Sequence, residues 1–493
     1  MKPSKYQEAV YDHFEARQKN GAVVSVAGSG KTYTAIESLS RVPPLYNVLL
    51  AAFNKDIRID FQAKIQAKGL RHVTPSTFNA FGWGICTKNC RGVVLDENKT
   101  QRTLEFVTWN PQTDAERKRM WSHMRTIERL VSLFKSRGFM TADEADANLD
   151  EIYEYHGITE PPPRDILLHT FSRSANNTKI MDYDDQKYMP IKFGWAIPRF
   201  DTVVIDEFQD TCEIELRLMR AAAEGGIMYA FGDPDQTIYS FKGVTPDNFE
   251  RFKVDMQADE LPLSICYRCP KSVVREAQKV VPRIEPWDEA PEGSVDWEST
   301  EDFLRSVREG DFVLCRTTAP LIRRNIQLLE MGKQAKVRGR DIGDKLQILI
   351  DVVSKWEKRM PIKEFVTRLL EYKTEQSEKL AAIRNEAGIS SLHDRVDSTV
   401  ALAKDCYEVY DLERRIREVF CDDKAKHGGV DMMTGHKSKG LQAPRVHILR
   451  PDLLPHPMAK KPWMQEEEER LRYVMVTRSQ DQLRYVRKEE NER

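Results

Sequence analysis

The feature that most constrains the fold is a short apolar strand that leads into a glycine-rich turn and then a helix. Residues 22–27 (AVVSVA) are apolar and mostly β-branched, which predicts a buried strand. Gly28, Ser29 and Gly30 follow, and a helix-compatible stretch begins near Lys31. The backbone N–H groups of such a turn and the positive end of the helix dipole face the same point, which favours an anion. The segment therefore predicts an α/β unit with a phosphate-binding turn.

Two side chains of this unit carry its expected chemistry. Lys31 is placed to reach the β- and γ-phosphates of a nucleotide, and the Thr32 hydroxyl is placed to ligate Mg²⁺. The strict phosphate-loop pattern fails at one position, since Ser25 stands where the first glycine belongs. An ordinary glycine-rich turn is therefore the alternative for this motif taken alone.

A second apolar strand ends in two adjacent carboxylates. The segment Thr202–Glu207 (TVVIDE) predicts a buried strand with Asp206 and Glu207 at its tip. Asp206 is suited to hold Mg²⁺ through water, and Glu207 is suited to polarise an attacking water. Neighbouring residues of a strand point to opposite faces, which fits two different tasks. A solvated strand end is the alternative, and the phosphate site at Lys31 makes it the weaker one.

Together with further motifs, these segments resemble the UvrD/Rep-type superfamily 1A DNA helicases. The resemblance covers nearly the whole chain, and its motifs stand in the order of that family. Those motifs are YQEAV (6–10), AAFNKD (51–56), STFNAFG (76–82), FGDPDQTIYSFKG (231–243), CYRCP (266–270), TGHKSKGLQ (434–442) and EERLRYVMVTRS (468–479). The resemblance implies an α/β fold of the P-loop NTPase type, with two RecA-like parallel-sheet lobes that each carry a mainly helical insertion.

For the nucleotide, the resemblance implies ATP in a cleft between the two lobes and a set of contact residues. Gln7 would read the adenine, Gln236 would contact the γ-phosphate, and Arg268 and Arg478 would stabilise the charge of the transition state. Catalytic roles are implied for Lys31, Glu207, Gln236, Arg268 and Arg478, metal ligation for Thr32 and Asp206, and ATP contacts for Gln7, Ala27, Gly28, Ser29, Gly30, Lys31, Thr32, Tyr33, Tyr267 and Gln442.

Two positions depart from the pattern of the family. Tyr33 stands where an arginine is usual, so adenine is sandwiched by Tyr33 and Tyr267 or held by Tyr267 alone. Gln442 stands where a glutamate is usual; its neutral amide can hydrogen-bond a ribose but supplies no negative charge.

For the nucleic acid along which the protein would move (the track), the resemblance implies single-stranded DNA that lies across both lobes. Tyr239 and Phe241 share a face in extended backbone, and such rings stack on unpaired bases without regard to sequence; burial in the core is the alternative for both. The DNA contacts that the resemblance implies are Phe53, Asn54, Thr77, Phe78, Asn79, Tyr239, Phe241 and His436. The aromatic continuation after Gln236 is the version found in members that move 3′ to 5′.

A chain of 493 residues is too long for one hydrophobic core, which indicates two to four domains. Strands are expected at 47–53, 202–207 and 228–233 in the first lobe and at 311–316, 431–434 and 445–449 in the second. The expected domains are 1–83 with 191–258 (first lobe), 84–190 (first insertion), 259–343 with 428–493 (second lobe) and 344–427 (a shortened helical second insertion).

Composition constrains the kind of nucleic-acid surface, the cellular compartment and the expectation for a zinc site. The formal net charge is −1, so a nucleic-acid surface is a local groove rather than a global field. The basic stretch 88–137, with Trp109 and Trp121, is equally compatible with DNA contact and with a solvated helical face. Eight scattered cysteines and the lack of a secretion signal or a membrane-spanning apolar run indicate a reducing cytoplasm, bacterial or of a host cell, with association to the nucleoid. The pair Cys266 and Cys269 is not expected to bind zinc.

These observations together predict an ATP- and Mg²⁺-dependent 3′ to 5′ single-stranded DNA translocase and helicase. Its expected partners are single-stranded DNA and junctions with duplex, with single-strand-binding or replication and repair proteins as further candidates, and it is expected to act as a monomer. Two alternatives are open: a translocase that strips proteins from DNA with little unwinding, and a nucleotide-switched binding subunit without turnover. RNA is also open as a track.

Overall fold

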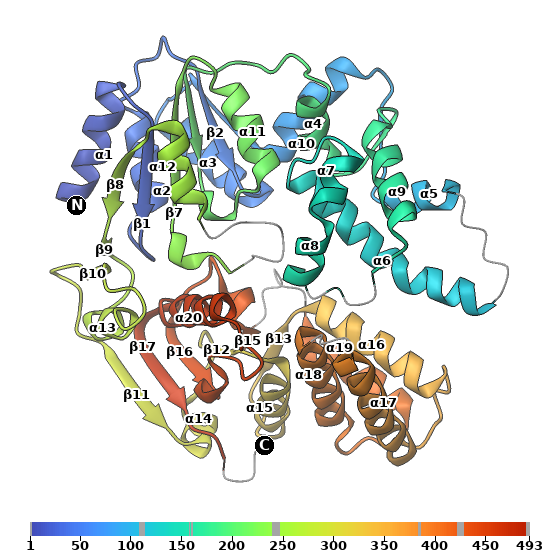
Figure 1. Ribbon diagram of the computed structural model, residues 1–493. Coiled ribbons are helices and arrows are strands. Elements are labelled where there is room, and N and C mark those ends of the chain that lie inside the picture. The colour runs from blue at the N-terminus through green and yellow to red at the C-terminus, as the bar shows by residue number, and fades with distance from the viewer. Residues whose placement is uncertain are drawn as a thin grey trace. The chain divides into compact units, whose positions relative to one another are not determined.

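The computed structural model describes residues 2–107, 114–156, 158, 161–238, 247–382, 386–421 and 428–489 and divides into two compact units (Figure 1). The first unit holds residues 1–26 and 30–264, and the second holds Ala27–Ser29 and residues 265–493. Each unit is built on one main parallel sheet, as expected for an α/β fold. Among the described residues, no helix combines the length and the apolar character that crossing a membrane requires.

The first unit contains a six-stranded parallel sheet in the order β3-β2-β6-β7-β1-β8. Its strands are β1 (Gly21–Ser25), β2 (Val48–Ala52), β3 (Val73–Thr77), β6 (Thr202–Ile205), β7 (Ile227–Gly232) and β8 (Asp259–Leu263). The helices of this sheet's unit are α1 (Lys5–Ala16), α2 (Lys31–Leu39), α3 (Lys55–Ala67), α4 (Phe78–Asn89), α11 (Glu213–Ala222) and α12 (Asn248–Met256). β1 and β6 are buried along their whole length, so apolar residues line both faces of the sheet centre.

The first insertion is mainly helical, as expected. Its elements are β4 (Val94–Leu95), α5 (Lys99–Phe106), α6 (Asp114–Ser136), α7 (Ala142–Ala147), α8 (Leu149–His156), α9 (Arg164–Asn176), β5 (Ile180–Met181) and α10 (Asp185–Lys192). Two buried lysines, Lys99 and Lys135, contact Asp185 at 2.5 and 2.8 Å, and Lys135 also contacts Asp182 at 2.6 Å. The acidic residues at the end of the insertion therefore form buried ion pairs with α5 and α6.

The second unit contains a seven-stranded parallel sheet, counted over the described residues, in the order β11-β17-β16-β12-β15-β13-β14. Its strands are β11 (Ser294–Glu298), β12 (Phe312–Cys315), β13 (Ala335–Arg338), β14 (Phe420–Cys421), β15 (Val430–Thr434), β16 (Ala443–Leu449) and β17 (Ser479–Val486). A separate small pair joins β9 (Ile265–Cys266) to β10 (Glu285–Pro286). The helices α13 (Lys271–Ala277), α14 (Thr300–Ser306), α15 (Thr318–Glu330) and α20 (Pro462–Val476) also belong to this unit.

The second insertion consists of α16 (Arg340–Ser354), α17 (Ile362–Ala382), α18 (Glu386–Ala403) and α19 (Val409–Val419). Buried side chains of these helices, such as Leu346, Phe365 and Ile416, belong to the same apolar cluster as Val313 and Val337 of the sheet. The helices therefore share one continuous core with the second sheet.

Two boundaries differ from those expected from the sequence. The segment 259–263 was assigned to the second lobe, whereas it forms β8, which pairs with β1 in the first sheet. The expected second insertion ends at 427, whereas Phe420 and Cys421 already pair with β13 at the edge of the second sheet. In both cases the decisive interaction is backbone pairing between distant segments, which a local pattern does not report.

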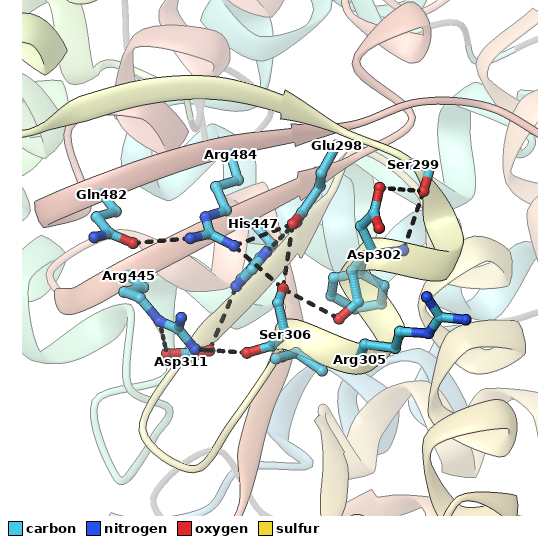
Figure 2. Close-up of polar contacts among 12 residues, drawn as sticks. Glu298, Ser299, Asp302, Arg305, Ser306, Asp311, Arg445, His447, Gln482 and Arg484 are labelled. Atoms are coloured by element: carbon cyan, nitrogen blue, oxygen red, sulfur yellow. Dashed lines mark hydrogen bonds and ion pairs between the residues drawn. The ribbon is translucent and has the colours of Figure 1, made fainter.

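The second sheet buries a charged network on one of its faces (Figure 2). His447 lies between two carboxylates, with Nδ1 2.6 Å from Glu298 and Nε2 3.4 Å from Asp311. The guanidinium of Arg445 donates two hydrogen bonds to the Asp311 carboxylate. Arg484 donates to the Glu298 carboxylate at 3.3 Å. Because these groups come from β11, β16, β17 and the turn before β12, the network fixes the register of that end of the sheet.

Candidate functional site

The glycine-rich turn has the backbone geometry that its sequence predicts. Gly28 and Gly30 adopt φ of +70° and +75°, in the left-handed region where a side chain is strained. Gly30 precedes α2, and no side chain caps that helix start. The first N–H groups of α2 are therefore not taken up by a capping side chain, as a site for an anion requires.

Lys31 lies between the two carboxylates at the end of β6. Its Nζ is 2.6 Å from Glu207 and 3.6 Å from Asp206. Parallel pairing places β6 beside β7 and β7 beside β1, so the carboxyl ends of these strands meet at one edge of the sheet. The structure thus brings together the three residues on which the sequence-based prediction of a nucleotide site depended most.

Burial and charge act in opposite directions on this trio. Burial raises the pKa of Asp206 to about 6, against the opposing effect of Lys31. Burial lowers the pKa of Lys31, but Glu207 and Asp206 outweigh it and hold that pKa above its ordinary value. Lys31 is therefore a cation, and its charge keeps two closely spaced carboxylates together.

A chain of polar contacts leads from Glu207 to Gln236. Gln209 donates to Glu207 at 2.6 Å and accepts from the backbone N–H of Asp233 at 3.0 Å. The side chain of Gln236 then donates to the Asp233 carboxylate at 2.7 Å. No role was predicted for Gln209 or Asp233, although Asp233 lies inside the motif 231–243 and Gln209 lies two residues after Glu207.

Gln7 is engaged within the first unit. Its side-chain oxygen accepts from the N–H of Ser4 and closes a capping box at the start of α1. Its amide nitrogen donates to Thr34 Oγ1 at 3.0 Å, which ties α1 to α2. Thr32 is half-buried and Tyr33 is exposed on the first turn of α2. The ring of Tyr33 is therefore available to a ligand, whereas Gln7 already has two partners.

Within the second unit, the turn residues Ala27–Ser29 contact two of the predicted motifs. The carbonyl of Gly28 accepts from the N–H of Tyr267 at 2.9 Å, and the N–H of Ala27 donates to the hydroxyl of Tyr473 at 2.8 Å. Tyr473 was not predicted as a site residue, although it lies inside the motif 468–479 that also contains Arg478. The signal that could have identified it is an aromatic residue five positions before the arginine in the same motif.

The two predicted arginines differ in their surroundings. Arg268 is half-buried and donates to the carbonyl of Thr477 at 3.2 Å. Arg478 is 1% exposed and donates to the carbonyls of Val474 and Leu441 and to the hydroxyl of Thr477. The guanidinium of Arg478 is thus held rigidly by backbone groups of its own unit rather than extended into solvent.

The remaining predicted residues of the second unit are His436 and Gln442. His436 is half-buried on the 3₁₀ turn Gly435–Ser438, and burial, with the neighbouring Arg316, lowers its pKa to about 4. It is therefore neutral at pH 7 and able to accept a hydrogen bond. Gln442 is exposed just before β16.

Among the predicted DNA contacts of the first unit, Phe78 is buried in the core, and the other four residues lie at or beside helix starts. Asn54 and Thr77 cap the starts of α3 and α4, and Phe53 is half-buried beside them. Asn79 donates to Tyr183 O and Gln186 Oε1. Phe78 is different, because it is 2% exposed and packs in the apolar cluster under the sheet. Its ring is a core group, so the prediction that Phe78 touches DNA is not supported by its position.

The predicted stacking residues Tyr239 and Phe241 lie outside the described residues. So does Trp109 of the basic stretch. Their neighbour Ile238, two residues after η2 (Pro234–Gln236), is fully buried.

The residues at the turn fit a nucleotide triphosphate with its metal ion. The hydroxyl of Ser29 is buried without a hydrogen bond among the described residues, whereas the Asp206 oxygen that also lacks one lies 3.6 Å from Lys31 Nζ. A buried polar atom without a partner is costly, and a ligand that supplies the partner removes this cost. Thr32 Oγ1 and Asp206 would hold Mg²⁺, while Lys31 and the turn would hold the phosphates.

Two family models match the chain. The UvrD/REP helicase N-terminal domain matches residues 5–257, and the UvrD-like helicase C-terminal domain matches residues 327–489. Together they take in the glycine-rich turn, Glu207 and Arg478.

Individual relatives are distant. The chain is similar to DNA helicase II of Haemophilus influenzae (31% identity over 84 residues, 17% of this chain and 12% of that protein). It is also similar to the ATP-dependent DNA helicase srs2 of Schizosaccharomyces pombe (22% identity; 54% and 33%). For the ATP-dependent DNA helicase PcrA of Staphylococcus aureus the identity is 22%, over 52% of this chain and 37% of that protein. The matched part thus spans little more than a third of these relatives at most.

Among solved structures, the helicase nonstructural protein 10 of an arterivirus aligns over 98% of this chain and 63% of its own, with a TM-score of 0.36 and 11% identity. A complex of the same protein with DNA aligns with a TM-score of 0.35 and covers 64% of that chain. Scores this low do not establish a shared fold.

Proposed function

The chain belongs to the UvrD/REP helicase family, and from this premise we propose that it is an ATP-dependent DNA helicase that moves 3′ to 5′ along single-stranded DNA. The observation that carries the proposal is the position of Lys31 between Asp206 and Glu207 at the carboxyl edge of the first sheet. Lys31 directly follows a turn with two left-handed glycines, at the start of a helix whose first N–H groups favour an anion.

In the proposed reaction each residue has a separate task. Lys31 neutralises the β- and γ-phosphates, and it must exchange part of its contact with Glu207 for the phosphate. Glu207 orients the attacking water and accepts its proton. Thr32 and Asp206 would hold Mg²⁺, which would supply positive charge at the phosphates. Arg268 and Arg478 stabilise the charge that develops on the transferred group, a contribution of about 10³–10⁵ in rate.

The contacts of Gln236 support coupling between hydrolysis and DNA. Gln236 is connected through Asp233 and Gln209 to Glu207 by hydrogen bonds. Hydrolysis of the γ-phosphate would therefore change the contacts at the start of the segment 237–243. That segment carries Tyr239 and Phe241, for which we propose stacking on successive bases. The 3′ to 5′ direction rests on the resemblance of this segment to the family members with that polarity.

The proposed partners are single-stranded DNA and junctions with duplex, and the proposed cofactors are ATP and Mg²⁺. A steady-state ATPase assay with single-stranded DNA, duplex DNA and RNA compares the candidate tracks directly. The proposal expects stimulation chiefly by single-stranded DNA. Turnover that no nucleic acid stimulates would instead support a nucleotide-switched binding subunit.

A further inference from the structure

A pocket of about 940 Å³ in the second unit is lined by none of the predicted site residues described above. Side chains of β11, β16, β17, α13 and α20 line it, together with the segment 451–454. Three of its residues, Trp297, Ile448 and Tyr485, stand near the carboxyl ends of their strands. The carboxyl edge is where parallel α/β sheets bind their ligands, and this volume lies within the usual range of small-molecule clefts.

An aromatic row forms the floor of this pocket. Trp297 pairs with Tyr485 across β11 and β17, and Tyr485 pairs with Ile448 across β17 and β16. The rings of Trp297 and Tyr485 stack with centroids 5.0 Å apart and an interplanar angle of 30°. Tyr485 is buried, whereas Trp297 is 55% exposed. One ring is thus held rigidly by its neighbour while it remains open to a second flat partner.

Two cations stand beside the open ring. Arg487 is two residues beyond Tyr485 and continues the pairing with β11, because its N–H donates to the carbonyl of Glu298; its side chain therefore points to the same face as Tyr485. Lys488 follows, and both side chains are exposed. Neither forms an ion pair with any residue that the structure describes.

The acidic residues of the pocket do not cancel this charge. Glu276 is paired with Lys279 at 2.5 Å, and Asp452 is paired with Arg450 at 2.8 Å. Each carboxylate is thus neutralised locally. The charge that the pocket offers to a ligand is therefore positive and lies at Arg487 and Lys488.

From this geometry we propose that the pocket is a nucleotide-binding site separate from the turn at Lys31. A base stacks on the open face of Trp297, and its phosphate lies against Arg487 and Lys488. The nucleotide comes from one of two sources: a unit of the single-stranded DNA track, in which case the site extends the proposed function, or a free nucleotide. Stacking on a fixed ring is sequence-tolerant and leaves the phosphate free for the two cations.

The test measures each source by itself. For DNA, the affinity of labelled oligothymidylate is compared between the parent chain, Trp297→Ala, Trp297→Phe and the double variant Arg487→Ala/Lys488→Ala. For free nucleotide, binding of a fluorescent ATP analogue is compared between Lys31→Ala and Lys31→Ala/Trp297→Ala, because Lys31→Ala disables the first site. Trp356→Ala, which removes an exposed ring elsewhere in the second unit, and Arg359→Ala are the matched controls.

The proposal predicts that Trp297→Ala weakens binding of at least one ligand by roughly 5- to 150-fold, the effect of one lost stack, and that Trp297→Phe retains most of the affinity. If DNA is the ligand, the double variant also lowers the salt dependence of its binding. Affinities for both ligands within twofold of the controls, in variants that melt like the parent, would overturn the site. A parent chain that binds no single-stranded DNA would contradict the proposed function, and the ATP-analogue arm would still decide the pocket.

Discussion

At Glu207 the backbone is left-handed, with φ of 53°, although the residue is not glycine. Such a conformation costs on the order of 1–3 kcal/mol and persists where the surroundings fix it, often at functional sites. Here the ion pair with Lys31 and the hydrogen bond from Gln209 fix it. The backbone therefore points the carboxylate of Glu207 away from the direction that regular strand alternation would give it.

Replacement of Glu207 by Gln is predicted to keep ATP and DNA binding and to lower turnover by at least 100-fold, because general-base catalysis contributes about 10²–10⁴ in rate. Glu215→Gln is the control, since that carboxylate pairs with Lys187 in the same unit. Steady-state ATPase with saturating DNA measures the effect. Turnover within a few-fold of the parent would show that Glu207 is not the catalytic carboxylate.

Phe241→Ala is predicted to separate hydrolysis from movement. ATPase at saturating DNA largely persists, while unwinding falls and DNA affinity drops by roughly 1–3 kcal/mol for one lost stack. Tyr407→Ala removes an exposed ring outside the predicted DNA contacts and serves as the control. If strand displacement by Phe241→Ala equals that of the control, the ring belongs to the core or duplicates another contact.

Single residues were predictable from sequence where a motif fixes both identity and geometry. Lys31, Asp206 and Glu207 were predicted in this way and lie in contact in the structure, because a strand end and a helix start leave few positions for such groups. Phe78 was placed on DNA from its motif alone, and the structure buries it. Tyr473 was missed because its role depends on contact with Ala27, which no local pattern encodes.

At the scale of elements, apolar runs located the strands well. The segments expected at 202–207 and 311–316 form β6 and β12, with ends shifted by one or two residues. The segment 259–263 was assigned to the other lobe, because only its backbone pairing with β1 shows that it belongs to the first sheet. The residues of a strand thus predict that a strand is present better than they predict which strand it pairs with.

The buried network around His447 predicts a pH dependence of stability. Burial lowers the pKa of His447, but Asp311 and Glu298 outweigh it and raise that pKa above its ordinary value. Arg445 and Arg484 face the same carboxylates, and Phe303 of α14 packs edge-on against the ring. The stabilisation from protonated His447 is therefore complete below the unfolded pKa of about 6.5 and is lost as the pH rises through the raised, folded value.

His447→Gln is accordingly predicted to lower the free energy of unfolding by roughly 1.5–3 kcal/mol below pH 6.5, where charged hydrogen bonds are lost. The deficit relative to the parent shrinks as the pH rises. Urea denaturation between pH 5.5 and 9 measures it, with His169→Gln on α9 as the control. A deficit that stays constant over this range would exclude titration of His447 as its source.

At the scale of the whole molecule, the second insertion bears on how the motor acts. Its helices α16–α19 share one apolar core with the second sheet rather than forming a core of their own. A segment packed in this way has little freedom to swing and restrain the motor, so we propose that the monomer is the active form. In single-turnover unwinding, amplitude that rises only with two or more enzymes per DNA tail would contradict this proposal.

The central claim is that the chain converts ATP hydrolysis into 3′ to 5′ movement along single-stranded DNA. Unwinding of duplexes with a 3′ or a 5′ single-stranded tail, with Mg²⁺ and ATP and with Glu207→Gln as the control, tests it most directly. The account predicts strand displacement on the 3′-tailed substrate alone, and none with Glu207→Gln. Displacement that requires a 5′ tail, or that Glu207→Gln carries out equally well, would contradict it.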